Sequence, residues 1–187
     1  RMEYAKAISH SSRRLAGLIT NILKLNKLEN QQIFPKHEAF DLSGQLCECL
    51  LQFEDAWDAK NLNIETDIQD DVRICSDAEL LSLVWNNLIS NAVKFTPEGG
   101  TIGVTLATDQ RNVIVSVSDT GCGIEPETGK HIFEKFYQGD TSHAMQGNGL
   151  GLALVKRVMD ILSGEISVHS TPGRGSTFTV KIGRIAE

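Results

Sequence analysis

The chain has 187 residues, of which 41% are hydrophobic and 22% are charged, a composition typical of a globular domain. Its formal net charge of −6 differs from that of a nucleic-acid-binding surface, where clustered lysines and arginines neutralise phosphates. We therefore expect no nucleic-acid partner. The four cysteines lack the spacing of zinc ligands and are expected to be reduced thiols. No apolar run reaches about 18 residues, so the sequence predicts no membrane-spanning segment.

Residues 1–30 show a seven-residue repeat of apolar side chains, which predicts a helix of a bundle or coiled coil. The repeat consists of Ile8, Leu15, Leu18, Ile22 and Leu25. One such helix cannot bury its apolar seam alone, so we expect a partner helix from another segment or another chain. The pattern is already helical at its first residue, which predicts that the sequence is part of a longer protein. A polar connector, residues 31–40, is the predicted domain boundary.

The second predicted domain, residues 41–187, contains helix and strand patterns throughout. Alternating apolar residues predict strands at residues 62–68, 72–74, 101–107, 112–118, 165–170 and 177–182. Helical periodicity predicts helices at residues 42–59, 77–95 and 151–162, with a short helical turn beginning at Pro126.

The predicted helix that ends at Phe95 carries asparagines among its apolar residues. Asn87 and Asn91 are four residues apart and Lys94 follows three residues later, so all three lie along one stripe of the helix. Asparagine prefers caps and turns to helix interiors. We interpret the stripe as facing a ligand. The alternative is that these side chains find hydrogen-bond partners within the core.

Glycine-rich turns follow at residues 119–124, 147–152 and 172–176. Glycine lets backbone N–H groups approach an anion without a Cβ atom in the way. The second turn leads into a helix, whose positive end favours phosphate, although such a turn alone also fits a surface loop. Asp119 follows an apolar strand, where its carboxylate can accept the exocyclic amino hydrogen of adenine. The alternative for Asp119 is an Asx turn at a strand exit.

The order and spacing of five motifs resemble the N, G1, F, G2 and G3 boxes of bacterial sensor histidine kinases. The matching stretches are residues 87–95, 119–123, 133–136, 147–152 and 173–178. Residues 41–187 are thus similar to a catalytic ATP-binding domain of the Bergerat type. This resemblance implies an α+β fold, a two-layer α/β sandwich of a mixed sheet with helices on one face, preceded by one long bundle helix. Residues 1–30 resemble the second helix of the dimerisation and phosphotransfer hairpin.

The resemblance implies that the chain binds ATP and Mg²⁺ and transfers the γ-phosphoryl group to a histidine, for relay to the receiver domain of a response regulator. It implies Asn91 as the Mg²⁺ ligand, Asn87 and Lys94 as phosphate contacts, and Asp119 as the adenine contact. The implied nucleotide-binding residues are Asn87, Asn91, Lys94, Phe95, Asp119, Gly121, Gly123, Ile124, Gly147, Asn148, Gly149, Leu150, Gly151, Leu152 and Thr177. It also implies an ATP lid over residues 138–146, a homodimer through the N-terminal helix, and a cytoplasmic location within a membrane-bound sensor.

His10 lies in a stretch that looks like the phosphoacceptor box of this family, but the acidic residue after the histidine and the later proline are missing. The family's acceptor lies on the first helix of the hairpin, whereas residues 1–30 resemble the second. We therefore expect the acceptor to lie outside this sequence and the chain not to phosphorylate itself. Gln138 stands where many relatives carry arginine, so the usual cationic phosphate contact is missing there.

Two other functions remain open at this stage. A Bergerat ATPase that drives a conformational clamp generally has a glutamate at the position of Asn87 to activate water, and asparagine is no base. A nucleotide-sensing module without kinase activity would bind ATP but transfer nothing. The presence of Asn91, Lys94 and Asp119 argues against a degenerate site.

Overall fold

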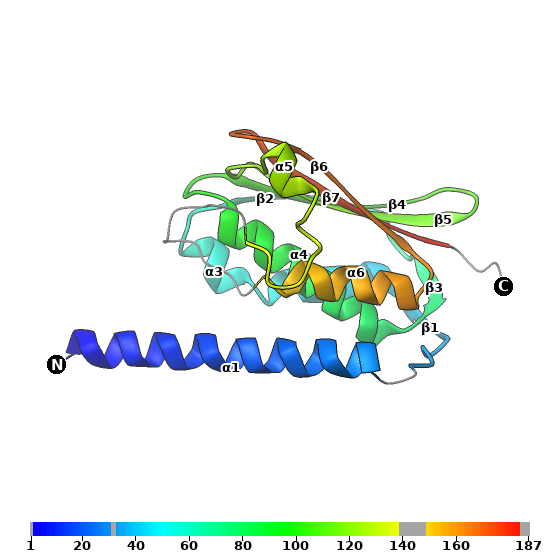
Figure 1. The fold of residues 1–187 in the computed structure, drawn as a ribbon. Helices are drawn as coiled ribbons and strands as arrows, with labels where there is room; N and C mark the ends of the chain where they lie inside the picture. Colours follow the sequence, from blue (N-terminus) through cyan, green and yellow to red (C-terminus); the bar gives the residue numbers. More distant parts are fainter. Residues whose placement is uncertain (1, 31–32, 139–148, 184–187) are drawn as a thin grey trace.

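The computed structural model describes residues 2–30, 33–138 and 149–183, and a five-stranded sheet forms one layer of the fold (Figure 1). In chain order the elements are α1 (Met2–Asn30), β1 (Glu38–Asp41), α2 (Leu42–Leu51), α3 (Glu54–Asp58), β2 (Asn63–Ile68), β3 (Arg73–Ser76), α4 (Ala78–Phe95), β4 (Thr101–Thr108), β5 (Asn112–Asp119), α5 (Pro126–Gly129), α6 (Gly151–Ile161), β6 (Glu165–Thr171) and β7 (Gly175–Gly183). Helices α4 and α6 lie under one face of the sheet, and α1 runs beneath them (Figure 1).

The sheet is mixed, with the strand order β2-β4-β5-β7-β6. Strands β2 and β4 are parallel, and the other neighbours are antiparallel. Val113, Val115 and Val117 of β5 are buried, while the alternate residues Ile114, Ser116 and Ser118 are half-buried, as expected when one face is packed and the other open. The predicted α+β fold, a mixed sheet with helices on one face, is therefore confirmed.

Helix α4 forms the centre of the core, because it contacts α2, α6 and β5. Leu81, Val84 and Trp85 are completely buried along its inner face. The buried indole N–H of Trp85 also has a hydrogen-bond partner, because Nε1 donates to Gln45 Oε1 of α2 at 2.9 Å. This packing fixes the orientation of the whole helix, including the stripe of asparagines on its other side.

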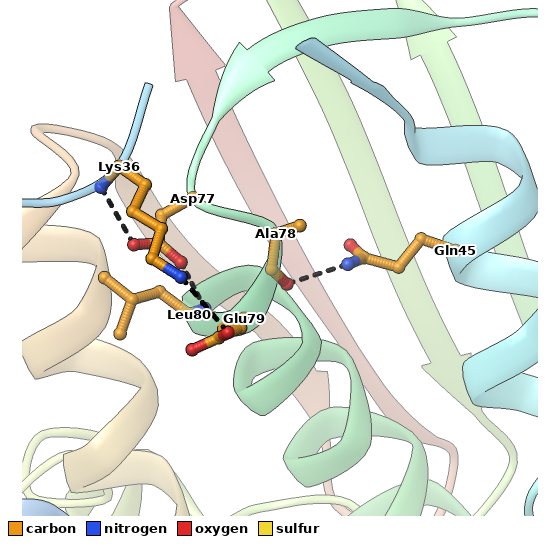
Figure 2. A network of polar contacts seen from close by, with 6 residues as sticks. All are labelled: Lys36, Gln45, Asp77, Ala78, Glu79 and Leu80. Carbon is orange, nitrogen blue, oxygen red and sulfur yellow. Dashed lines mark hydrogen bonds and ion pairs between the residues drawn. The ribbon is translucent and has the colours of Figure 1, made fainter. Parts of the chain in front are cut away.

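The N-terminal end of α4 is held by a small network of polar contacts (Figure 2). Asp77 is the N-cap, and its Oδ1 accepts from the Leu80 N–H at 3.0 Å. Its Oδ2 accepts from the backbone N–H of Lys36 at 3.0 Å. Gln45 Nε2 donates to the Ala78 carbonyl oxygen at 2.7 Å. One end of α4 is thereby joined both to the segment before β1 and to α2.

Two stretches differ from the sequence-based expectation. The single helix predicted over residues 42–59 is broken into α2 and α3 at Phe53, whose φ of −104° and ψ of 10° leave the helical region. From this bent segment Phe53 and Trp57 pack, partly buried, against the core. Part of the predicted connector is strand β1, which pairs with β3 in a separate two-stranded sheet. The boundary between the two domains stays a prediction.

The long helix α1 packs against α6 through its last turns. Leu25 and Leu28 are buried there, and Arg157 Nε donates to the Leu28 carbonyl oxygen at 2.9 Å. Glu29 forms an ion pair with Lys135 at 2.6 Å. Among the described side chains of α1, the large apolar ones that remain exposed are Leu15, Ile19, Ile22 and Leu23. Within the described ranges, no helix is apolar over a length sufficient to cross a bilayer.

Candidate functional site

Asn87 and the start of α6 meet on the outer side of α4. Asn87 Nδ2 donates to the Leu83 carbonyl oxygen at 2.7 Å, which fixes the orientation of its carboxamide. A Cβ atom added at Gly151 would lie 2.8 Å from Asn87 Oδ1, closer than real Cβ atoms come. The glycine at the first position of α6 therefore lets the helix terminus approach Asn87. The N box and the G2 box, which are far apart in sequence, lie side by side here.

Asn91 is one turn further along α4 and is half-buried. Its carboxamide makes no hydrogen bond to any residue that the structure describes. Most buried or half-buried amides in proteins find an internal partner, as Asn87 does. The Asn91 side chain thus has the hydrogen-bonding capacity that a ligand contact requires.

Lys94 and Phe95 end the stripe. The Lys94 ammonium lies 4.5 Å from the centroid of the Phe95 ring, within the range of a cation–π contact. Both side chains are half-buried. The stripe from Asn87 to Lys94 therefore places two carboxamides and one cation on the same side of α4.

Asp119 ends β5 and begins a tight turn against the C-terminal end of α4. Its Oδ1 accepts from the Gly121 N–H at 2.8 Å. Burial raises the pKa of this carboxyl, while the backbone N–H groups of Gly121 and Ser176 oppose the rise. A Cβ atom at Gly121 would lie 2.5 Å from the Phe95 carbonyl oxygen, so only glycine fits this turn. The carboxylate is thus anchored beside α4 in a partly desolvated position.

Gly123 and Ile124 continue this turn toward β6. Gly123 has a φ of +69°, and an added Cβ atom would collide with the Thr171 carbonyl oxygen, so two constraints favour glycine here. The Ile124 N–H donates to Ser170 Oγ at 2.8 Å. The G1 and G3 turns also meet directly, because the Gly173 N–H donates to the Cys122 carbonyl oxygen at 2.7 Å.

The remaining residues of the G2 box are partly described. Gly147, Asn148 and the predicted lid from residue 139 onward lie outside the described residues, as does the side chain of His10. Gly149 accepts a hydrogen bond from the Phe136 N–H at 2.8 Å, which joins this box to the F box. Leu150 is 1% exposed and packs in the core. The partly buried Leu152 packs against the core as well, so these two residues position α6.

Thr177 lies next to the ladder partner of Asp119, but its side chain points to the other face of the sheet. It pairs with Ser118 and His169, and the alternation along β7 turns its side chain toward the open face, because Phe178 occupies the core face. The residue opposite Asp119 in the ladder is Ser176, which is buried on the helix-covered face. The sequence analysis placed Ser176 in the G3 box but chose Thr177 as the site residue. The burial of its neighbour Phe178 and the period of two were the signals that could have identified it.

The described residues contain no group of three or more His, Cys, Asp or Glu side chains arranged to hold a metal ion. A divalent cation near Asn91 would therefore depend on oxygen atoms that a bound phosphate ligand and water supply, which is the usual preference of Mg²⁺.

The sequence matches the family model described as histidine kinase-, DNA gyrase B-, and HSP90-like ATPase over residues 76–184. The sensor-like histidine kinase SenX3 of Mycobacterium bovis is 32% identical over 186 residues, which cover 98% of this chain and 45% of SenX3. The chain thus spans about half the length of this curated relative.

Two solved structures have the same fold. Full-length ShkA in complex with AMPPNP superposes with a TM-score of 0.85 at 29% identity, covering 99% of this chain and 39% of ShkA. Histidine kinase ThkA in complex with the response regulator protein TrrA has a TM-score of 0.80 at 24% identity, covering 98% of this chain and 51% of ThkA. Since the family model covers more than half of the chain, the chain belongs to the histidine kinase-, DNA gyrase B- and HSP90-like ATPase family and corresponds to the ATP-binding catalytic portion of sensor histidine kinases.

Proposed function

We propose that this chain binds Mg-ATP along α4 and transfers the γ-phosphoryl group to a histidine of the sensor kinase to which it belongs. The observation that carries the proposal is that two glycine-dependent turns approach the C-terminal half of the same helix, α4. The start of α6 meets α4 at Asn87, and the Asp119 turn meets it at Phe95. Eight residues separate these two points, about 12 Å of helix, a span suited to a nucleotide with its phosphates.

Each residue of the candidate site has a role that follows from its chemistry. Asp119 accepts a hydrogen bond from the exocyclic amino group of adenine, and its partly desolvated position strengthens that contact. Asn87, Lys94 and the N-terminus of α6 bind phosphate oxygens. Asn91 offers its amide oxygen to Mg²⁺, which fits its lack of a hydrogen-bond partner among the described residues. When bound, Mg²⁺ neutralises phosphate charge.

Phosphoryl transfer is favoured over ATP hydrolysis by the composition of the stripe. Asn87 occupies the position at which clamp-type ATPases of this fold have a glutamate, and its amide nitrogen is already engaged with the Leu83 carbonyl oxygen. An amide cannot take a proton from water. Phosphoryl transfer depends mainly on positioning and charge neutralisation, and the residues of the site supply both.

The acceptor histidine and the partners belong to the same proposal. We place the acceptor outside this sequence, in a homodimer formed through the exposed apolar face of α1, which consists of Leu15, Ile19, Ile22 and Leu23. A response regulator would then receive the phosphoryl group in the cytoplasm, where ATP is available. ThkA has the same fold as this chain, and its solved complex with the response regulator TrrA supports this kind of partner.

Nucleotide binding is tested by calorimetric titration of ATP and GTP with and without Mg²⁺. We expect Asp119→Asn to weaken ATP binding by about 2 kcal/mol, the value of a lost charge-assisted hydrogen bond. The variant should also bind ATP and GTP with more similar affinities than the wild type does. Asn91→Ala should make ATP affinity independent of Mg²⁺. Unchanged affinities in both variants would remove these residues from the site.

The transfer step is tested in the full-length kinase with γ-labelled ATP, by measuring acid-labile phosphohistidine. We expect Asn91→Ala to lose the label and His10→Gln to retain it. Loss of the label in His10→Gln would show that the acceptor lies in α1 after all.

A further inference from the structure

Lys60 occupies the turn between α3 and β2, and its ammonium group reaches the C-terminal end of α4. Its Nζ donates to the carbonyl oxygens of Val93 at 2.7 Å, Lys94 at 3.0 Å and Thr96 at 3.0 Å. An ammonium group has three N–H donors, so all of its donors are engaged at this one place. The cation also lies at the negative end of the helix dipole, where it is favoured.

The other carbonyl groups of the last turn are accounted for separately. The Ala92 carbonyl oxygen accepts from the Thr96 N–H at 3.0 Å and from its Oγ1 at 2.6 Å. The Phe95 carbonyl oxygen faces Gly121 in the turn of Asp119. Helix ends leave four carbonyl groups without an intrahelical partner, and here Lys60 satisfies two of them. Lys60 thus holds the C-terminal end of α4 on both sides of Phe95, the residue against which the Asp119 turn packs.

The backbone of Lys60 is itself fixed relative to this end of α4. Its carbonyl oxygen accepts from the Gly99 N–H at 3.0 Å, and the Asn63 N–H donates to the Gly100 carbonyl oxygen at 2.8 Å. The turn before β2 and the turn before β4 therefore form one unit. Because its backbone is anchored in this way, the ordering of the Lys60 side chain costs only its own rotamer entropy, which its three hydrogen bonds offset.

We propose that Lys60 is a positioning residue for the phosphate side of the nucleotide site. It holds the backbone of Val93 and Lys94, and this fixes the origin and direction of the Lys94 side chain toward the phosphates. Lys60 does not itself touch the nucleotide. This inference rests on the proposed role of Lys94 as a phosphate contact.

Lys60→Met tests the inference, because methionine keeps the apolar stem and removes the three donors. We expect the affinity of Lys60→Met for Mg-ATP to fall about tenfold, the equivalent of one hydrogen bond to a charged group, and its affinity for adenosine to change less than about twofold. Calorimetric titration of both ligands at a temperature where the variant is folded gives the two values. Equal losses for ATP and adenosine would overturn the inference, since a general loss of structure predicts that result.

Lys36→Met is the matched control at the opposite end of the same helix. Lys36 Nζ pairs with Glu79 at 3.3 Å on the exposed surface, so its removal also deletes a lysine contact to α4. We expect the affinities of this control for ATP and adenosine to stay at the wild-type values. A loss for ATP equal to that of Lys60→Met would contradict a specific role for Lys60.

A double-mutant cycle with Lys94→Met tests the route through which Lys60 acts. If Lys60 acts through Lys94, the loss of ATP affinity in the double variant should equal that of Lys94→Met alone. Full additivity would overturn the inference. If Lys60→Met does not fold, Lys60→Gln replaces it, because glutamine keeps a donor without the charge. The inference is then tested by the same comparison of the affinity losses for ATP and adenosine.

The experiment separates this inference from the proposed function. Failure of the wild-type chain to bind Mg-ATP would refute the proposed function itself. Binding by the wild type that Lys60→Met leaves unchanged would refute only the role of Lys60.

Discussion

The two ends of α4 are fixed in opposite ways. At the N-terminal end, the adjacent Asp77 caps the helix with its own side chain and also binds the backbone of Lys36. At the C-terminal end, no neighbouring side chain in the described part of the chain caps the Val93 and Lys94 carbonyl groups, and Lys60 reaches them from a turn more than thirty positions earlier. The first end is joined to α2 and to the segment before β1. The second end forms part of the candidate site.

This difference separates stability from ligand binding along one helix. A change at the Asp77 end should lower the free energy of unfolding without moving the ligand contacts, because Asn91 and Lys94 lie several turns away. A change at the other end should alter affinity, because the turn of Asp119 and the Lys60 contacts both meet α4 there. Three substitutions test this separation.

The largest effect is expected for Gly121→Ala. Its Cβ atom would lie 2.5 Å from the Phe95 carbonyl oxygen and 2.7 Å from Asp119 Oδ1, so the turn has to move away from α4. We expect ATP binding to weaken by about 2–3 kcal/mol, as overpacking against backbone usually costs. Calorimetric titration measures it. Gly183→Ala is the control, because nothing lies within 4 Å of a Cβ atom there, and equal affinities in both variants would contradict the close fit at Gly121.

Asp77→Ala breaks the opposite end of the helix. It removes the cap of α4 and the contact with the Lys36 N–H, so we expect a loss of about 1–2 kcal/mol in the free energy of unfolding. Thermal denaturation should show a midpoint lowered by roughly 2–4 °C for each kcal/mol. ATP affinity should remain that of the wild type while the protein is folded. Asp77→Asn should restore most of the stability, since asparagine is an equally good N-cap.

The smallest effect concerns the pH dependence of stability at Asp119. Burial raises the pKa of this carboxyl in the folded state, so folding favours its protonated form. Its contribution to stability is therefore greatest below the unfolded pKa and is lost as the pH rises through the folded pKa.

Asp119→Asn without nucleotide should be more stable than the wild type at neutral pH, because the amide stays neutral and can still accept from the Gly121 N–H. The difference should shrink as the pH is lowered through the raised pKa of Asp119. Thermal denaturation at a series of pH values measures it, and a difference that grows on acidification would contradict the assignment of burial as the cause.

The N-terminal end of α4 was readable from the sequence because its signals are local. Asp77 precedes an apolar helical pattern, and the five motifs follow at fixed spacings, so the family, the mixed sheet and the helix stripe were predicted. Strand β1 was missed because it is a short, exposed edge strand that shows no alternation of apolar residues. The break at Phe53 was missed because the apolar period continues through it.

Long-range contacts explain what the sequence could not reveal about the site. Lys60 has no motif that links it to Val93 and Lys94, and only the tertiary fold brings them together. Ser176, and not Thr177, lies opposite Asp119 because of the register of β7, which depends on its two neighbouring strands. A shift of one residue along a strand turns a side chain to the opposite face.

The attachment of α1 to α6 has a mechanical consequence. Among the side chains that the structure describes, those of the last turns of α1 join it to the helix layer, where the Leu28 carbonyl oxygen accepts from Arg157 Nε and Glu29 pairs with Lys135. If α1 tilts about this contact, the remaining length, about 35 Å of helix before Leu25, is the long arm of a lever whose pivot lies on α6. A swing of several ångströms at its far end becomes a much smaller displacement at the pivot. Helix α6, whose first residue faces Asn87, would thus move much less than the far end of α1, by a distance on the scale of a hydrogen bond.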